Sequence, residues 1–436
     1  MNFYSMPFTA TLRRYFFLFP FFTLSFICLN SYLSYGEIPA KPLTLKQVYE
    51  YALLKNESIP IQDERILQAE EKDTQAKGAI LPKANLMANY LYQASPGDAA
   101  ASSAKSTQSN IRLNVTQPIF HGFREFALYR SVQADLESQK ATREQSKLSL
   151  FSQVGQAYYN VLFAEQDLKN LQVLLDLTQK RVVDLQERAR VGRSRSSEVL
   201  TAQSQVSILK NQLENAQLVI DQARESFAFV TGLSKNSPLV PLEDSFSFHV
   251  EDLNSYLSSI EKRPDIAALN QQVISSEEQQ TAAKGAHYPS VDFSGNYYFQ
   301  RAGSLEGTNW DIGFTFSLPL YQGGVLSSQV SEAASRVKEK SLLFYQGKRN
   351  AEKEIRAAYD TVTSNLAQFK TLSEAFKIAQ KTYEEQNRDY RLGLSTNLDV
   401  LQSLNTLEET KRTLDRTRNQ IFASWVTLQA ATGRLP

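Results

Sequence analysis

The sequence predicts a mainly α fold with a small β part, built from long coiled-coil helices and four short strands in two copies of one unit. Three observations support this prediction. Short motifs recur in the same order in both halves of the chain, apolar residues at heptad spacing continue through very long segments, and shorter segments alternate apolar with polar residues.

An internal duplication organises the chain. A Lys-Gly-Ala segment followed by proline, a later proline, a turn glycine and a Thr-Gly pair occur in both halves in the same order. The pairs are Lys77-Gly78-Ala79 and Pro82 with Lys284-Gly285-Ala286 and Pro289, Pro118 with Pro319, Gly192 with Gly393, and Thr231-Gly232 with Thr432-Gly433. Preserved order and spacing predict a duplicated structural unit. We expect a first repeat at 37–232, a linker at 233–262 and a second repeat at 263–436.

Residues 1–36 have the pattern of a secretory signal peptide. Two arginines precede an apolar run at 15–29, and Ser34 and Gly36 occupy the small-residue positions of a cleavage site. This run is too short to span a membrane as an anchor. The only cysteine, Cys28, lies within it, but an isoleucine precedes it where lipid-modified proteins usually have a small residue, so a lipidated N-terminus is the less favoured alternative.

Each repeat is expected to contain a helix, two strands, a very long helix, a glycine turn and a further helix. The spans in the first repeat are 44–78, 83–94, 109–120, 123–190 and 196–231. The spans in the second repeat are 264–285, 290–301, 309–320, 324–391 and 397–432.

The long helices carry a heptad seam. From Val154 to Ala189 every seventh residue is apolar, and a second, mostly apolar series starts at Ala157. The second copy repeats this spacing from Ile355 to Tyr390. Such a seam is typical of coiled coils. A helix of this length would run roughly 100 Å, which is more than a compact domain needs.

The segments at 290–301 and 309–320 alternate apolar and polar residues, as strands with one apolar face do. Their length suits tilted strands that cross a bilayer, although a soluble sandwich would alternate in the same way. Four strands cannot close a barrel, since small barrels need about eight, and open edges are not tolerated in lipid. We therefore expect several chains to pool their strands, and three chains would form a 12-stranded transmembrane barrel.

Composition argues against other classes of protein. The chain has 47 Lys and Arg against 46 Asp and Glu, so it offers no general basic character for nucleic acid. Its 3 histidines stand at unrelated positions and predict neither a metal site nor a catalytic base. The glycine pair at 323–324 lacks the Lys-Ser/Thr pair of a phosphate-binding loop. We expect no enzyme activity, no cofactor and no bound metal.

Taken in order, several motifs resemble the TolC-like outer-membrane channel proteins of bacterial efflux and secretion systems. These motifs are the two Lys-Gly-Ala-x-x-Pro segments, Arg263-Pro264-Asp265-Ile266, Pro319-Leu320-Tyr321 with Gly323-Gly324, and Arg391-x-Gly393-x-Ser395-x-x-x-Asp399-Val400-Leu401. The resemblance covers almost the whole mature chain. It implies a homotrimer in the outer membrane with a 12-stranded barrel and a coiled-coil helical tunnel through the periplasm. Such a channel conducts passively what an inner-membrane pump and a periplasmic adaptor deliver, in multidrug efflux or type I secretion.

The resemblance also implies an adaptor-docking site at the two glycine turns, at the end of the long helices farthest from the barrel. Its residues would be Val191, Gly192, Arg193, Ser194, Leu392, Gly393, Leu394 and Ser395. Glycine there permits the positive φ that a tight helix turn requires. The alternative is that both segments are simply helix turns, although this does not explain the serine that follows each glycine by two residues.

A periplasmic gate is implied beside the same turns, formed by Asp399, Glu198, Tyr390, Gln402 and Arg391. Three copies of Asp399 would face one another and attract cations. Gln402 stands where family members often have a second acid, which predicts weaker block by divalent cations. Tyr390 and Glu198 are expected to share a hydrogen bond that holds the tip shut. Alternatively, Glu198 caps its helix and Tyr390 fills a heptad position.

The competing interpretation is an exported coiled-coil spacer or adhesin without transport activity. It explains the heptads and the signal peptide, but it does not require duplicated alternating strands. The sequence leaves the cargo open, and it leaves open whether the partner pump is driven by protons or by ATP.

Overall fold

The structure is a computed structural model that describes residues 41–92, 107–241, 249–302 and 307–435. Its contacts divide the chain into Met1–Tyr35 and Gly36–Pro436, and every described residue belongs to the second unit. The expected signal peptide, Cys28 within it, and most of the loop expected between the first two strands lie outside the described residues.

The first half of the described chain contains four helices and two strands in the expected order. They are α1 (Leu45–Lys55), α2 (Ser58–Ile80), β1 (Lys83–Tyr92), β2 (Thr107–His121), α3 (Arg124–Arg190) and α4 (Ser196–Thr231). The expected single helix at 44–78 is wrong, because α1 and α2 are separate. Asn56 is extended between them, and its side chain donates to Val230 O at 2.8 Å and accepts from Ser58 N at 2.9 Å. These two bonds replace helical hydrogen bonds at the break.

The second half repeats this plan with two short additions. Its elements are α5 (Leu253–Leu257), the 3₁₀ helix η1 (Ile260–Lys262), α6 (Pro264–Gly285), β3 (Ser290–Gln300), β4 (Trp310–Ser317), α7 (Val325–Leu392) and α8 (Asn397–Ala431). α5 and η1 lie within the expected linker at 233–262 and were not predicted, since elements of 5 and 3 residues are too short to show a period.

The four strands form one antiparallel sheet in the order β1-β2-β3-β4. The two repeats meet at its centre, where β2 pairs with β3 and Asn114 donates to Asn296 Oδ1 at 2.9 Å. Pro118 lies inside β2 beside a register shift, a place where a strand tolerates a missing N–H. β1 and β4 occupy the outer positions, so one edge of each pairs with no other described strand.

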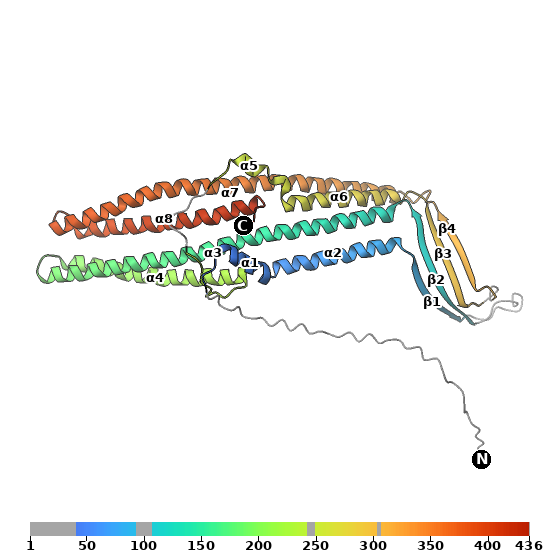
Figure 1. Cartoon of the computed structure of the whole chain (residues 1–436), viewed down its shortest axis with the longest axis horizontal. Helices are drawn as coiled ribbons and strands as arrows, with labels where there is room; N and C mark the ends of the chain where they lie inside the picture. Colours follow the sequence, from blue (N-terminus) through green and yellow to red (C-terminus); the bar gives the residue numbers. More distant parts are fainter. Residues whose placement is uncertain (1–40, 93–106, 242–248, 303–306, 436) are drawn as a thin grey trace, which may run out of the picture. The chain divides into compact units, whose positions relative to one another are not determined.

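The helices next to the sheet lie side by side in one layer. In this four-helix layer α3 contacts α2 and α6, and α6 contacts α7 (Figure 1). Farther from the sheet, α4 packs along α3 to form a first hairpin and α8 packs along α7 to form a second hairpin. The two hairpins meet chiefly through α3 and α8. Within the described ranges, no helix has an apolar stretch long enough for a membrane span.

The heptad seam of α3 forms much of the core. The whole second series is buried, namely Ala157, Ala164, Leu171, Thr178 and Leu185. From the first series Val154 and Val161 are fully buried beside α1, α4 and α8 in the largest core cluster. In α7 the seam is buried at Ile355, Val362 and Tyr390. The coiled-coil prediction is therefore confirmed. The glycine turns lie at the ends of the two hairpins.

Candidate functional site

The two glycine turns have nearly the same hydrogen bonds. After α3, Gly192 has φ +74° and Arg193 N donates to Arg188 O at 2.8 Å. After α7, Gly393 has φ +77° and Leu394 N donates to Asp389 O at 2.8 Å. Each bond closes a Schellman-type helix end, which needs a residue in the left-handed region. A Cβ at either glycine would meet nothing within 4 Å, so backbone conformation alone accounts for the glycine.

The serine two residues beyond each glycine ties its turn to a helix. Ser194 Oγ donates to Glu198 Oε2 at 2.6 Å, within the start of α4. Ser395 Oγ donates to Gln386 O at 3.1 Å, back towards α7. The shared serine therefore has an internal structural use in both copies, so plain helix turns explain it without a docking partner.

Asp399 belongs to a capping box at the start of α8. Thr396 Oγ1 donates to Asp399 Oδ2 at 2.6 Å, Thr396 N donates to the same oxygen at 2.8 Å, and Asp399 N donates back to Thr396 Oγ1 at 3.3 Å. The hydroxyl bond, followed by the backbone bond, lowers the pKa of Asp399 from its usual value. The Thr-x-x-Asp spacing of this box is visible in the sequence, but our prediction used the acid only for the gate.

A groove of about 720 Å³ lies between the two turns, and we call it the tip groove. It brings together seven of the predicted site residues: Arg193, Glu198, Tyr390, Arg391, Leu392, Gly393 and Ser395. Additional lining comes from Arg188, Arg195, Ser197, Thr201, Thr396, Asn397 and Leu398. Residues from both hairpins thus share one surface at the tip.

The other predicted gate residues line a different hollow. Asp399 and Gln402 belong to a hollow of about 520 Å³ between α7 and α8, with Ile378, Thr382 and Gln386 opposite them. The predicted gate residues therefore fall into two groups, one in the tip groove and one between the helices of the second hairpin.

Tyr390 joins the two hairpins through an arginine that the sequence did not single out. Its ring is buried beside Leu185 and Val400, and the Arg181 guanidinium lies 3.9 Å from the ring centroid. Arg188 approaches the same ring at 5.0 Å. Arg181 Nε also donates to Asn397 Oδ1 at 2.9 Å, which connects α3 directly to α8. Burial lowers the pKa of Arg181, although the group stays charged at neutral pH.

Glu198 and Tyr390 have separate partners in this arrangement. Glu198 accepts from the nearby Ser194, and Tyr390 packs against Arg181. A hydrogen bond between Tyr390 and Glu198 is not among the contacts of the described residues, although both side chains line the tip groove. We name Arg181, Tyr390 and Asn397 the arginine latch, because they link the first hairpin to the second.

Two further polar links join α3 to α8 nearer the middle of the hairpins. Arg412 makes a bidentate ion pair with Asp167, with Nε and Nη2 at 2.6 and 2.9 Å from the two carboxylate oxygens. Asn170 donates to Asp415 Oδ2 at 2.8 Å. Charged residues beside a heptad seam often make such interhelical bonds, and this general rule is the one sequence signal that could have indicated Arg181 and Arg412.

The chain matches the family model described as outer membrane efflux protein over residues 48–233 and 256–434, which takes in both turns and all the residues of the tip groove. Among curated proteins, it is 25% identical over 410 residues to outer membrane protein TolC of Escherichia coli, covering 90% of this chain and 82% of that protein. It is 21% identical over 380 residues to the pyoverdine export outer membrane protein OpmQ of Pseudomonas aeruginosa, covering 83% and 79% of the two chains.

Solved structures show the same fold. The outer membrane protein VceC of Vibrio cholerae superimposes with a TM-score of 0.80 at 20% identity, covering 89% of this chain and 96% of the other. The outer-membrane channel OprN gives a TM-score of 0.80 at 18% identity, with 89% of each chain covered.

Proposed function

This chain belongs to the outer membrane efflux protein family, and from this premise we propose that three copies form the outer-membrane channel and periplasmic tunnel of a tripartite efflux or type I secretion system. The channel is of the TolC type and lies in the outer membrane. The protein conducts passively, and the energy for transport comes from an inner-membrane pump that a periplasmic adaptor connects to the tunnel.

The single observation that carries the proposal is the four-stranded sheet, in which the outer edges of β1 and β4 pair with no other described strand. Lipid cannot satisfy the backbone N–H and C=O groups of such edges. Pairing β4 of one copy with β1 of the next satisfies them, and three copies close a barrel of 12 strands. The long hairpins then lie side by side around one axis and enclose the tunnel.

The two turns are suited to docking an adaptor. Val191, Leu392 and Leu394 are 64%, 68% and 76% exposed, so each turn presents an apolar side chain at its tip. Of these three apolar residues, Leu392 lines the tip groove, together with Arg193 and Arg391. We propose that the end of an adaptor coiled-coil hairpin occupies this groove, burying the leucines and placing acidic or polar groups against the arginines.

The gate is proposed at the same end of the hairpins. Three ionised copies of Asp399, each held at the start of α8 by Thr396, would surround the axis and favour cations. Opening moves the second hairpin away from the first and so separates Arg181 from Tyr390 and Asn397. Adaptor binding supplies the energy only if the adaptor binds the open arrangement more tightly.

Planar-bilayer recordings of the mature protein extracted from outer membranes test this function. We expect small, cation-preferring current steps, with a weaker cation preference in Asp399→Ala. Correctly folded protein without any conductance would contradict the channel and favour a structural spacer. If wild type and Asp399→Ala conduct with the same ion selectivity, the channel stands but Asp399 is not part of the gate.

A further inference from the structure

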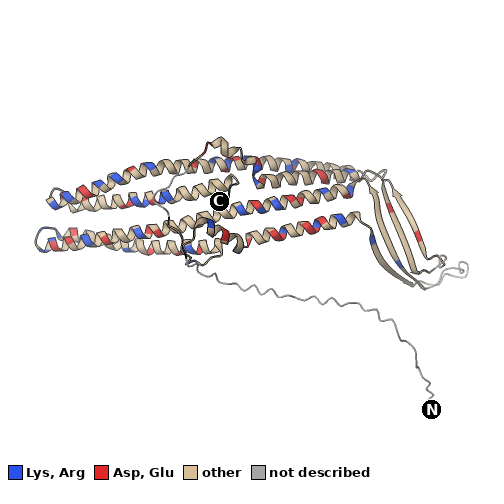
Figure 2. Ribbon diagram, in the orientation of Figure 1, with Lys and Arg blue, Asp and Glu red and all other residues tan. Residues whose placement is uncertain are grey.

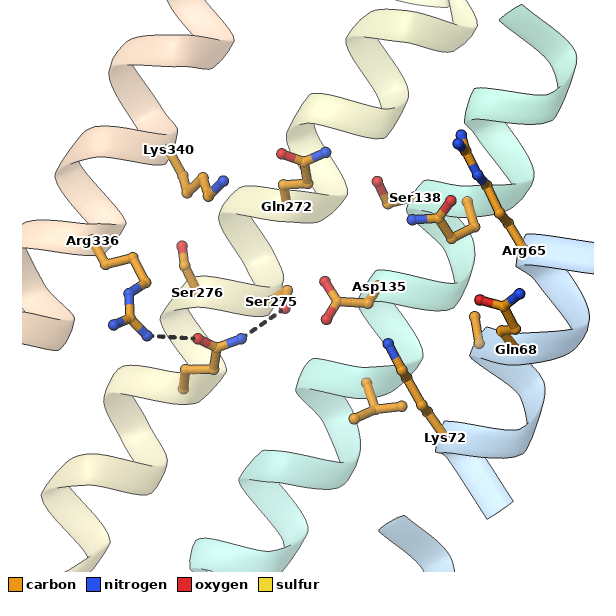
Figure 3. A pocket seen from close by; sticks show the side chains of 14 residues that line it. Arg65, Gln68, Lys72, Asp135, Ser138, Gln272, Ser275, Ser276, Arg336 and Lys340 are labelled. Atoms are coloured by element: carbon orange, nitrogen blue, oxygen red, sulfur yellow. Dashed lines mark hydrogen bonds between the residues drawn. The ribbon is translucent and has the colours of Figure 1, made fainter. Parts of the chain in front are cut away.

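A cavity in the four-helix layer is not part of the tip groove or the gate (Figure 3). Its volume is about 590 Å³, which is the size of a site for a small organic molecule. All four helices of the layer contribute to its walls. Its lining includes Arg65 and Lys72 from α2, Asp135 from α3, Gln279 from α6, and Arg336 and Lys340 from α7.

The position of the cavity identifies the face of the layer to which it belongs. α2 and α7 are the outer helices of the layer and are separated by α3 and α6. Side chains from both outer helices converge on one hollow only where the layer is concave towards it, since they diverge on a convex face. The concave face of a layer that closes into a tunnel is the inner face. In the proposed assembly, the cavity would therefore open to the tunnel.

The cavity has a clear excess of positive charge. Arg65, Lys72, Arg336 and Lys340 are its basic side chains, and Asp135 is its only acid. Arg65, Lys72 and Lys340 form no ion pair with any described residue, while Arg336 is shared between Glu332 at 2.8 Å and Gln279 Oε1 at 3.4 Å. Figure 3 shows the two α7 cations on one side of the hollow and the two α2 cations on the other. A chain with almost balanced charge thus gathers four basic side chains around one hollow, and three of them form no ion pair within the described residues.

The rest of the lining consists mainly of hydroxyl and amide groups. Ser275, Ser276 and Gln272 of α6 lie between the two pairs of cations (Figure 3). Gln279 Nε2 donates to Ser131 at 3.2 Å and to Ser275 at 3.4 Å, which fixes its amide so that Oε1 faces Arg336. This lining offers charge and hydrogen bonds but little apolar surface, and it therefore suits a hydrophilic ligand rather than an apolar one.

We propose that this cavity is a binding station for multiply charged anionic cargo, which carries carboxylate, sulfonate or phosphate groups, on its way through the tunnel. The inference deepens the proposed function and rests on it, because an inner face exists only in the assembled channel. Cations on opposite walls bind a molecule with anionic groups at both ends better than a monoanion. The station raises the local concentration of such cargo and opposes the cation preference of the gate.

Fluorescence anisotropy with the trisulfonated dye pyranine tests the station in mature protein extracted from outer membranes. We expect Arg336→Gln with Lys340→Gln to weaken binding about tenfold, since each lost charge-assisted contact costs a few-fold in affinity. The matched control is Arg349→Gln with Lys353→Gln. This pair has the same residue types, spacing and helix, is exposed, and does not line the cavity.

The outcomes separate the station from the channel. Binding weakened in the cavity variant and unchanged in the control supports the station, as does competition by citrate at lower concentration than by acetate. Equal binding by all three proteins, or no binding by the wild type, overturns it. Planar-bilayer current from the same samples tests the channel separately, because loss of the station leaves conductance intact. Arg65→Gln with Lys72→Gln on α2 replaces the first variant if thermal unfolding shows that it is misfolded.

Discussion

At the scale of single residues, the arginine latch is the contact that most directly couples the two hairpins at the tip. Arg181 is only 11% exposed and lies against a buried aromatic ring. Its Nη2 is buried without a hydrogen-bond partner among the described residues, so the latch is not fully satisfied. A buried cation with an unpaired donor favours whatever arrangement restores its hydration. In the proposed mechanism the latch holds the closed arrangement, and its unpaired donor lowers the cost of releasing it when an adaptor docks.

Arg181→Met removes the charge and keeps most of the side-chain volume. We expect larger or more frequent openings in planar bilayers, because the cation–π contact and the bond to Asn397 are worth about 2 kcal/mol together at a desolvated site. Lys180→Met is the control, since Lys180 is adjacent, exposed and paired only within its own helix to Asp176. Recordings in which Arg181→Met and Lys180→Met behave alike would show that the latch does not restrain opening.

Glu408 is a buried carboxyl group on α8 that the sequence did not reveal. It is 5% exposed, its Oε2 makes no hydrogen bond within the described chain, and its position in the seam resembles that of an apolar residue. Burial raises its pKa, an effect that Lys411 and Arg412 partly offset. Its folded-state pKa lies above the unfolded value, so the folded protein favours the protonated carboxyl group. The contribution of this group to stability is therefore present at low pH and is lost as pH rises through the folded pKa.

Glu408→Gln should therefore stabilise the protein at pH 8, by about 1 kcal/mol, and change its stability less at pH 5. Thermal unfolding of the extracted protein at both pH values measures the difference. Glu409→Gln controls for the loss of one charge, since Glu409 is exposed. A stabilisation that is the same at both pH values would mean that Glu408 is not the group whose ionisation matters.

At the scale of elements, the close approach of α3 and α8 fixes the spacing of the two hairpins. Gly155 lies in the middle of α3, and a Cβ built there would stand 2.5 Å from Val426 Cγ1 of α8. Helices approach this closely only where one of them lacks a side chain. Gly155 is thus retained for packing, whereas the turn glycines are retained for their positive φ.

Gly155→Ala should destabilise the protein by about 1–3 kcal/mol, because the added methyl overpacks the contact with Val426. Gly78→Ala is the matched control, since Gly78 is also helical but has nothing within 4 Å of its Cβ position. There the substitution should stabilise the helix by up to about 1 kcal/mol. Melting temperatures that shift in the same direction for both variants would contradict the packing argument.

Gly393→Val tests the second turn as a docking element. A β-branched residue at φ +77° strains the turn by about 1–2 kcal/mol without a clash, because the space around the Cβ position is open. We expect normal amounts of protein in the outer membrane and reduced efflux of a fluorescent substrate. Loss of the protein from the outer membrane would assign Gly393 to folding instead.

The sequence predicted those elements that have a hydrophobic period or a residue type with a distinct backbone preference. Heptad spacing located α3 and α7 almost to the residue, and the turn glycines fixed the ends of these helices because positive φ is encoded by residue type. The break at Asn56 was missed, since it depends on a bond to Val230 in a distant helix. Arg181 and Glu408 were missed for the same reason. Their importance lies in what they meet across the bundle, and charge alone usually indicates an exposed helix face.

At the scale of the whole molecule, the sign of the local charge changes along the proposed path of the cargo. Figure 2 shows Lys, Arg, Asp and Glu distributed along the long helices and sparse on the strands, as expected if the sheet meets lipid. Against this mixed background, the cavity of the four-helix layer is basic and the proposed gate ends in Asp399. Along the proposed tunnel, cargo would therefore meet two different electrostatic environments in succession.

A density map of the protein extracted from outer membranes into nanodiscs, determined by electron cryo-microscopy, tests the central claim most directly. We predict three copies around one axis, with β4 of each copy hydrogen-bonded to β1 of the next and the basic cavity facing the enclosed tunnel. A monomer, a different copy number that leaves the outer edges of β1 and β4 unpaired, or a basic cavity facing outward would contradict the account.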